Sequence, residues 1–295
     1  MLTKFGENIM CDYVIVSDLT MDLPYDFEGS SEILTLPMEV LIGEKSYNGN
    51  DIDVNDFYSK MRQKVPVFTT QINPSEFEEF FSNYFEQGKD IIYLCLSSKL
   101  SGMYNSACLV AKELMKKYPE RKLEVIDSLG ASLGIGHLAS EALKMRSSGA
   151  DIEETAKHIN EIKHRLYHWF VVDDLYHLKR GGRLSASAAL IGSMMNIKPI
   201  LKIDSDGALS VHESVRGRKK AFSTLISKLQ ECSQNKNMEN ETIYIAHADC
   251  ENDAKFLAEE INKIINVKNI VIHSITPVIG AHTGAGTLAL IFSGL

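Results

Sequence analysis

The sequence has few cysteines and places them far apart. The five are an odd number and none belongs to a CxxC pair: Cys11, Cys95, Cys108, Cys232 and Cys250. A zinc knuckle or a thiol redox motif needs closely spaced cysteines, so neither is expected, and no metal site is predicted. Scattered, unpaired thiols fit a reducing compartment, and a cytoplasmic location is predicted.

Long apolar runs are also absent. No uninterrupted hydrophobic segment approaches the roughly 18 residues that a membrane-spanning helix needs. The first ten residues lack an apolar stretch followed by a small-residue cleavage site, so they do not form a secretory signal. We expect a soluble protein without stable membrane insertion, beginning with a loose tail over residues 1–12.

Basic residues are outnumbered by acidic ones. Lys and Arg total 31 against 39 Asp and Glu, which gives a formal charge of −8, while 44% hydrophobic and 24% charged residues are ordinary for a globular protein. An acidic surface repels the phosphates of nucleic acids and anionic membranes. Nucleic acid is therefore not an expected partner.

A phosphate-binding loop of the GxxxxGK[ST] type is missing as well. The pattern Gly134-x-Gly136-x-x-Ala139 resembles a dinucleotide fingerprint, but its first glycine comes several residues after the strand predicted at 123–127. We interpret these glycines as allowing close packing of a helix over 131–146. No cofactor is expected, and the chain is not expected to bind ATP on its own.

What the sequence does contain is an alternation of strand and helix patterns over 295 residues, enough for two domains. The predicted fold class is α/β. We expect an N-terminal α/β domain with a parallel sheet over 13–168 and a C-terminal α/β domain over 169–295. Smaller expectations are a turn at 43–50, a small-residue helix at 186–195, a hairpin around Asp206-Gly207 and a polar linker at 234–241.

The most informative stretch joins an apolar run, Ile91–Leu96, to a helix predicted over 103–118. The six apolar residues predict a buried parallel strand, and the turn after them ends in Ser101 and Gly102. In an open α/β sheet, ligands bind beyond the carboxyl ends of the strands, where helix N-termini attract anions. Either this turn binds an anion, or Ser101 is simply the N-cap of the helix.

A second cluster of hydroxyl and amide groups, Thr69, Thr70 and Gln71, also precedes a helix. That helix, over 75–85, is predicted by a capping box in which Asn73 is the N-cap and Glu76 the third helical residue. The polar cluster is either an ordinary loop or a second part of the same binding site.

Basic residues and one histidine mark the second half of the chain. Arg180 and Arg183 flank two glycines in a loop that is either a solvated turn or an anion-binding one. A group containing Arg216, Arg218, Lys219 and Lys220 opens a predicted helix, although a helix N-terminus prefers acids; these residues are interpreted as a patch for an anionic group or as a partner surface. His282 lies among small residues that cannot pack its ring, so a functional role is expected.

Two other groups have ordinary explanations. Asp18 and Asp22 follow the predicted first strand and are more typical of caps than of an acid/base or metal site. His164 and His168 have the i, i+4 spacing of a helical zinc site, but no third ligand is in register, so a solvated pair is expected.

Several short motifs occur in order along the chain: Asp18-Leu-Thr-Met-Asp-Leu23, Thr69-Thr-Gln71, Leu96-Ser-Ser-Lys-Leu-Ser-Gly-Met-Tyr-Asn105, Lys179-Arg-Gly-Gly-Arg-Leu-Ser185, Ile197-Lys-Pro199 and His282-Thr-Gly284. Together they resemble the DegV family of bacterial fatty-acid-binding proteins, which work with a fatty acid kinase. The resemblance covers the chain from Tyr13 to its end. The sequence departs from the usual family pattern at Leu19, Thr70 and Ile72, where the family usually has serine, serine and proline.

The resemblance implies two α/β domains with a ligand tunnel between them. It implies that Thr69 and Ser101 hold a fatty acid carboxylate with support from His282, and the matching motifs add Thr70, Gly102 and Thr283 to this ligand-binding set. Arg183 and Arg216 are implied to face the tunnel mouth, where the kinase phosphorylates the carboxylate.

The leading hypothesis is a carrier without catalytic activity of its own. It binds a long-chain fatty acid, presents the carboxylate to a fatty acid kinase and retains the acyl phosphate, which feeds phospholipid synthesis. The alternative is a hydrolase of a lipid-like ester with Ser101 as nucleophile and His282 as base, although Ser101 is not in a GxSxG elbow.

Overall fold

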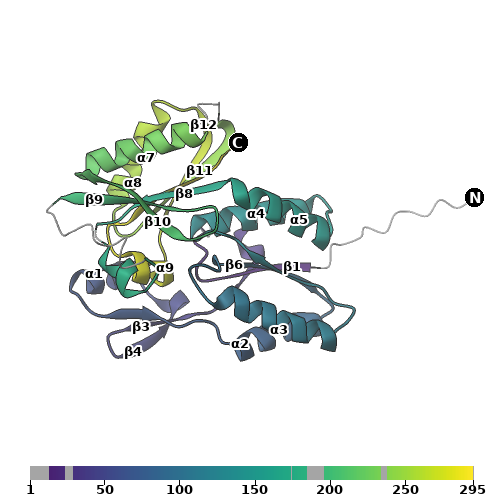
Figure 1. Cartoon of the computed structure of the whole chain (residues 1–295). Coiled ribbons are helices and arrows are strands. Elements are labelled where there is room, and N and C mark those ends of the chain that lie inside the picture. The colour runs from purple at the N-terminus through teal and green to yellow at the C-terminus, as the bar shows by residue number, and fades with distance from the viewer. Residues whose placement is uncertain (1–12, 24–28, 174, 185–195, 234–237, 295) are drawn as a thin grey trace, which may run out of the picture.

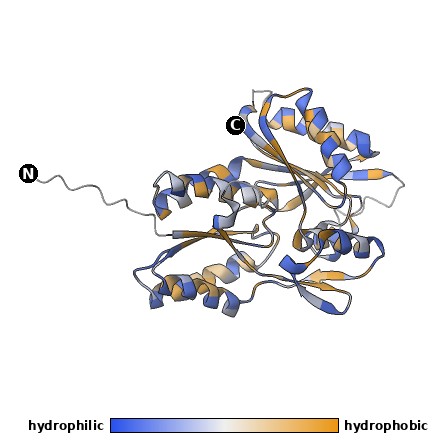
Figure 2. Ribbon diagram, turned by 180° about the vertical axis from the view of Figure 1, so that it is seen from behind, coloured by the Kyte–Doolittle hydropathy of each residue, from blue (hydrophilic) through white to orange (hydrophobic). Residues whose placement is uncertain are grey.

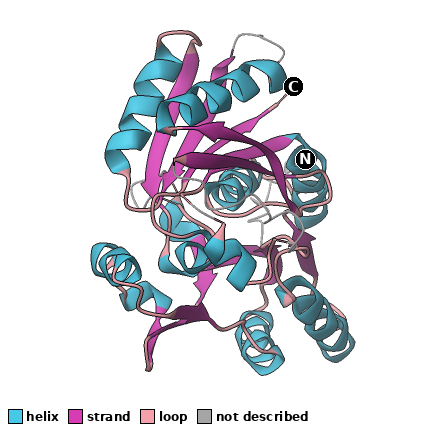
Figure 3. Ribbon diagram, turned by 60° about the vertical axis from the view of Figure 1, so that its left-hand side comes forward, coloured by secondary structure: helices cyan, strands magenta, loops and turns pink. Residues whose placement is uncertain are grey.

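The computed structural model describes residues 13–23, 29–173, 175–184, 196–233 and 238–294. In these ranges the strands form three sheets, which Figures 1 and 3 show as separate layers with helices between and around them. Sheets A and B come from the first half of the chain and sheet C from the second. The predicted tail at 1–12 and the predicted helix at 186–195 lie outside the described residues.

Sheet A is entirely parallel, with the order β2-β1-β6-β7. Its strands are β1 (Tyr13–Asp18), β2 (Ile33–Leu36), β6 (Asp90–Cys95) and β7 (Leu123–Asp127). The side chains from Ile91 to Cys95 are fully buried, because helices cover both faces of the sheet. The prediction of a buried parallel strand at this point is confirmed.

Four helices cover sheet A, two on each face. Helices α2 (Pro74–Glu86) and α3 (Met103–Lys117) pack together on one face, and α4 (Leu133–Ser147) and α5 (Ile152–Ile162) on the other (Figure 1). The predicted capping box of α2 is present, and Asp151 and Glu154 form another at the start of α5. Figure 2 shows the strands mostly hydrophobic and the outer helices alternating between hydrophobic and hydrophilic residues, as one-sided burial requires.

Sheet B is a small antiparallel sheet with the order β4-β3-β5. Its strands are β3 (Glu39–Ile42), β4 (Lys45–Asn48) and β5 (Val67–Thr69). The 3-10 turn η2 (Gly49–Asp51) and helix α1 (Val54–Arg62) lie between β4 and β5, and another 3-10 turn, η1 (Ser30–Glu32), precedes β2. The predicted turn at 43–50 was therefore wrong for 45–48. This strand was missed because its residues are polar and mostly exposed.

Sheet C is mixed, with the order β10-β9-β8-β13-β11-β12, and only β11 and β12 are parallel. Its strands are β8 (Leu166–Val171), β9 (Ile197–Ile203), β10 (Leu209–Arg216), β11 (Met238–His247), β12 (Val267–Ser274) and β13 (Leu288–Ser293). The predicted hairpin around Asp206-Gly207 is confirmed as β9-β10. The predicted linker at 234–241 was wrong for 238–241, which begin β11.

The helices of the second half are α6 (Tyr176–Arg180), α7 (Arg218–Cys232), α8 (Glu251–Asn262) and α9 (Pro277–Thr283), with the 3-10 turn η3 (Lys163–Arg165) before β8. Helices α7 and α8 pack on sheet C. Arg216 does not open α7 as expected but ends β10. The short α9 was not predicted, because Gly280 and the surrounding small residues hide its helical periodicity.

Helix α4 lies between the two large sheets and packs on β1 and β6 of sheet A and on β11 and β13 of sheet C. Its glycines permit this: a Cβ on Gly136 would lie 2.6 Å from the Asp22 carbonyl oxygen, and one on Gly134 would lie 2.0 Å from His168 Nε2. The prediction that these glycines serve close packing is confirmed. Since β8 starts at Leu166, the predicted boundary between 168 and 169 falls inside a strand, and the division into two domains stays a prediction.

The expectation of a solvated histidine pair was wrong for His168. Helix α5 ends at Ile162, so His164 lies in η3 and His168 in β8, and the two do not share a helical face. His168 is buried against Gly130 and Gly134, and burial lowers its pKa from 6.5 to about 4.

Candidate functional site

One cavity lies beyond the carboxyl ends of β1, β6 and β7, where sheet A meets β5, α9 and the β9-β10 hairpin. It contains about 890 Å³ of space between protein atoms, counting the part open to solvent. Parallel strands end at this edge of the sheet, so the position agrees with the expectation for an open α/β fold.

Most of the lining is apolar and comes from both halves of the chain. The first half contributes Met38, Leu96, Leu100, Met103 and Ala131, and the second half contributes Phe170, Leu178, Ile203, Leu209, Ile275, Val278, Ile279, Ala289 and Ile291. These side chains follow the ordinary core pattern of their elements, so the sequence carried no signal that separated them from other buried residues.

The polar lining contains most of the predicted site residues. Thr69, Thr70, Ser101, Arg183, His282 and Thr283 all line the cavity, although they come from four separate segments. Gln71, Thr20 and Ser132 also line it. Gln71 belongs to the predicted polar cluster and Thr20 to the motif over 18–23, but neither Thr20 nor Ser132 is among the predicted site residues.

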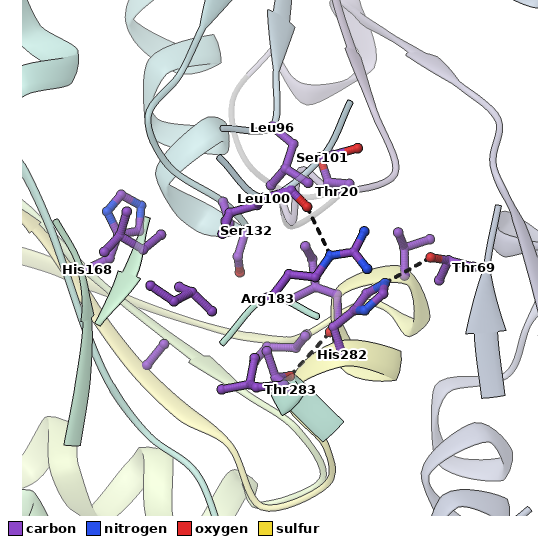
Figure 4. Close-up of a pocket in the computed structure, with 18 of the residues that line it drawn as sticks. Thr20, Thr69, Leu96, Leu100, Ser101, Ser132, His168, Arg183, His282 and Thr283 are labelled. Carbon is purple, nitrogen blue, oxygen red and sulfur yellow. Dashed lines mark hydrogen bonds between the residues drawn. The ribbon is translucent and has the colours of Figure 1, made fainter. Parts of the chain in front are cut away.

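The central polar contact joins Thr69 and His282. Thr69 ends β5 and His282 lies in the last turn of α9, and the Thr69 Oγ1 to His282 Nε2 distance is 2.9 Å. Figure 4 shows both side chains at one end of the cavity, with the apolar side chains extending away from them. Two predicted residues from opposite halves of the chain therefore meet directly.

The ring of His282 is neutral at pH 7. Desolvation lowers its pKa from 6.5 to about 4, with further lowering from the nearby Arg183, Arg180 and His177. A neutral imidazole has one N–H. When this proton is on Nε2, the ring donates to Thr69 Oγ1 and leaves the threonine O–H free to donate into the cavity.

Arg183 brings a positive charge into the cavity. Its Nε donates to the Leu100 carbonyl oxygen at 3.0 Å, and its Nη1 donates to the Gly181 carbonyl oxygen. In Figure 4 its guanidinium lies between Leu100 and His282. Burial lowers the pKa of Arg183, but an arginine keeps its charge at any physiological pH.

Ser101 lines the cavity from the turn before α3. The N-cap of α3 is Gly102 and not Ser101, yet Ser101 Oγ accepts a hydrogen bond from the Met103 N–H at 3.3 Å. Because Ser101 Oγ is the acceptor in this bond, its O–H can donate to a different group. A Cβ on Gly102 would lie 3.2 Å from Gln71 Oε1, so Gly102 lets the loop after β5 approach α3.

The other predicted residues have clear positions. Thr70 is exposed at the cavity edge, with its N–H bonded to Glu39, and Thr283 Oγ1 donates to the Ile279 carbonyl oxygen at 3.3 Å. Arg216 is exposed at the end of β10 and does not line the cavity. Its role at the tunnel mouth stays a prediction.

Asp18 and Asp22 are fully buried, and each carboxylate accepts a hydrogen bond from a backbone N–H group, nearby in the sequence for Asp18 and distant for Asp22. Asp18 Oδ1 accepts from the Thr20 N–H and hydroxyl, and Asp18 Oδ2 accepts from Tyr93 OH at 2.6 Å. Asp22 accepts from the Thr276 N–H and the Ser132 hydroxyl. Desolvation raises the pKa of both carboxyls. Capping, the ordinary interpretation, is confirmed.

The geometry does not form a hydrolase triad. The hydrogen bond of His282 Nε2 goes to Thr69, and Figure 4 shows Ser101 on the far side of Arg183 from His282. The charged neighbours that shift the pKa of His282 are arginines, whereas a catalytic base needs a carboxylate to orient it.

None of the helices in the described ranges is long and apolar enough to cross a bilayer.

Comparison with known proteins gives one consistent result. A family model described as an uncharacterised protein of the DegV family matches residues 12–294. A DegV domain-containing protein of Clostridium perfringens is 41% identical over 288 residues, which are 97% of this chain and 98% of the relative.

Solved structures with the same fold cover the whole molecule. A DegV lipid-binding protein from Thermotoga maritima is 30% identical, with a TM-score of 0.85 over 96% of this chain and 99% of the other. DegV from Bacillus subtilis, described as a fatty acid binding protein, is 28% identical, with a TM-score of 0.82 over 97% and 100% of the two chains.

Proposed function

This chain belongs to the DegV family, and from that premise we propose that it is a carrier that binds one long-chain fatty acid in the cavity between its two halves. The observation that supports this best is the Thr69–His282 pair beside Arg183 at one end of an apolar cavity. The descriptions of the relatives from Thermotoga maritima and Bacillus subtilis as lipid-binding and fatty-acid-binding proteins agree with it.

The tail supplies the affinity. A chain of about 15 methylenes gains about 12 kcal/mol on full burial, at about 0.8 kcal/mol per CH₂, before the costs of ordering are subtracted. The apolar side chains from α3, α9, β8, β13 and the β9-β10 hairpin replace the water around it.

The head group needs donors and a countercharge. Removing a carboxylate from water costs several kcal/mol unless both are supplied. In our proposal Thr69 donates its O–H to the carboxylate while His282 Nε2–H donates to Thr69 Oγ1, Ser101 donates a second hydroxyl, and Arg183 provides the positive charge. Thr70, Gly102 and Thr283 shape the surroundings of this group.

The finer part of the proposal concerns a partner. The chain presents the bound carboxylate to a fatty acid kinase, which phosphorylates it to an acyl phosphate for phospholipid synthesis, and the carrier itself performs no catalysis. The acyl phosphate carries more charge than the carboxylate, which suits guanidinium groups. Arg183 faces it inside the cavity, and Arg216 contributes from outside. A cytoplasmic location belongs to the same proposal.

Mass spectrometry of an organic extract of the purified protein tests fatty acid binding directly. We expect one fatty acid per chain, retained through purification. Preparations that contain no fatty acid, and that take up none when it is added, would refute the carrier function.

A pair of variants tests the division of labour. Ser101→Ala is expected to weaken fatty acid retention, because a donor to the carboxylate is lost. Arg183→Lys keeps the positive charge for the carboxylate but loses the guanidinium fork that suits the acyl phosphate, so it is expected to reduce phosphorylation by the kinase more than it reduces binding, measured as the ratio of the phosphorylation rate to the occupancy. Equal effects of both variants on both quantities would contradict this division.

A further inference from the structure

Asp22 joins the first loop of the chain to the start of α9. Its side chain is fully buried, Oδ1 accepts from the Thr276 N–H at 3.0 Å and Oδ2 accepts from the Ser132 hydroxyl. Asp22 and Thr276 are 254 positions apart. A single carboxylate therefore connects the loop after β1, the start of α4 and the start of α9.

Helix α9 has no cap of its own. Its N-cap residue, Thr276, makes no side-chain capping bond, and the Thr276 hydroxyl donates instead to the Leu19 carbonyl oxygen at 3.1 Å. A seven-residue helix has little stability by itself and leaves its first N–H groups unsatisfied. Asp22 satisfies the first of these groups from a distant part of the chain.

The same helix carries the cavity residues Val278, Ile279, His282 and Thr283. It packs on β3, β5 and α1 of the first half and on α6 of the second. On the other side of its start, Tyr58 OH donates to the Ile275 carbonyl oxygen at 2.9 Å. The Ile275 carbonyl and the Thr276 N–H belong to one peptide group, so Tyr58 and Asp22 hold the same peptide at the start of the helix, Tyr58 at its oxygen and Asp22 at its N–H.

We propose that Asp22 is a positioning residue for the head-group end of the cavity. By capping α9 from the opposite half of the molecule, it sets the position of that helix, and with it the placement of the His282 ring against Thr69. The positioning is a property of the free protein; only its effect on fatty acid affinity rests on the proposed function.

Asp18 provides a matched comparison within the same loop. It is also fully buried, and desolvation raises its pKa as it does for Asp22. The hydrogen bonds of the Asp18 carboxylate go to Thr20 and Tyr93, which belong to sheet A and its loop. Loss of Asp18 therefore removes a buried carboxylate without uncapping α9.

The test compares Asp22→Ala, Asp22→Asn and Asp18→Asn by three measurements on the full chain. Imidazole ¹⁵N and ¹H NMR of His282, assigned with His282→Gln, reports the bond to Thr69 in the ligand-free protein. Hydrogen exchange reports the amides of α9. Titration with a fluorescent long-chain fatty acid reports affinity.

We expect Asp22→Ala to change the His282 resonances, to speed exchange in α9, and to weaken fatty acid binding about tenfold, because the ligand would then have to order the head-group end of the cavity on binding. Asp22→Asn, whose amide oxygen still accepts from Thr276, is expected to fold and to give a smaller shift of about threefold. Asp18→Asn is expected to lower stability while leaving the His282 resonances in place.

The proposal is overturned if Asp22→Ala leaves α9 exchange and the His282 resonances unchanged. If the Ala variant does not fold, the two Asn variants decide: the proposal is overturned if Asp18→Asn changes α9 exchange and the His282 resonances as much as Asp22→Asn does. If the Asp22 variants change the His282 resonances but the wild-type protein takes up no fatty acid, the positioning role is supported and the proposed ligand is refuted.

Discussion

The hydrogen bond between Thr69 Oγ1 and His282 Nε2 joins residues that are 213 positions apart. Taken alone, Thr69 could be an ordinary polar group of a loop, whereas the poorly packed ring of His282 already indicated a functional role. Their pairing matters because a neutral imidazole that donates to a hydroxyl directs the hydroxyl proton elsewhere. At the residue scale, an Nε2–H tautomer of His282 would orient the Thr69 hydroxyl as a donor before any ligand arrives.

Thr69→Val tests this donor. Valine has nearly the same shape but no hydroxyl, so the fold should be kept while a charge-assisted bond to the carboxylate is lost. We expect fatty acid affinity to fall about tenfold to a hundredfold, measured by titration. Thr242→Val, on β11 and outside the cavity lining, is the matched control, and an equal loss in both variants would contradict the assignment.

The residue types in helix α4 depend on what the helix packs against. It lies between two sheets, so its residues face protein on nearly every side, and glycine replaces larger residues at the closest approaches. Gly134 accepts the ring of His168 and Gly136 accepts the loop that carries Asp22. The dinucleotide-like spacing of these glycines therefore serves packing between elements.

Gly134→Ala tests this packing. Alanine favours an isolated helix by about 1 kcal/mol over glycine, but its Cβ would lie 2.0 Å from His168 Nε2. We expect a net loss of about 1–3 kcal/mol in the free energy of unfolding, measured by urea denaturation. In a His168→Ala background the same change should cost much less, because the clashing ring is gone. Equal costs in both backgrounds would mean that the contact with His168 is not the cause.

At the scale of the whole molecule, several contacts join the two halves. Arg62 Nε donates to Asp249 Oδ2 at 2.7 Å, Asp22 caps α9, and Ser97 Oγ donates to the Gly207 carbonyl oxygen at the tip of the β9-β10 hairpin at 2.8 Å. Buried residues of β11, α9 and β13 also belong to the same hydrophobic core as sheet A. The cavity lies between this core, which contributes Leu96 and Val278 to its lining, and a second, smaller cluster, which contributes Phe170 and Leu178.

The buried histidines make global stability depend on pH. The pKa values of His168 and His282 are about 4 in the folded protein and about 6.5 otherwise, so between these values the unfolded chain binds more protons. Stability should be greatest above pH 6.5 and fall as the pH drops toward 4, by up to about 3 kcal/mol for each ring.

The difference in unfolding free energy between the wild-type protein and His282→Gln, measured by urea denaturation from pH 7 to pH 4, isolates one ring. The raised carboxyl pKa values of Asp18 and Asp22 act in the opposite direction, but they are common to both proteins and cancel. A difference that stays constant over this range would contradict the lowered pKa of His282.

Much of the fold was predictable because its signals are local, whereas the roles predicted for the site residues came from the family resemblance. The buried strand over 91–95, the capping box before α2 and the β9-β10 hairpin depend on residues a few positions apart. The polar strand β4, the short α9 and the start of β11 were missed, because tertiary partners and not local pattern stabilise them. The apolar cavity lining was also beyond prediction, since a core residue and a cavity residue have the same periodicity.

The sequence by itself determined an α/β chain with hydroxyl-rich turns at the carboxyl ends of its strands, because spacing and capping act over a few residues. Only the tertiary structure decided that Thr69 meets His282, that Arg183 enters the cavity while Arg216 stays outside, and that Asp22 caps α9. These contacts join residues far apart along the chain, and their geometry depends on how two sheets pack around one central helix.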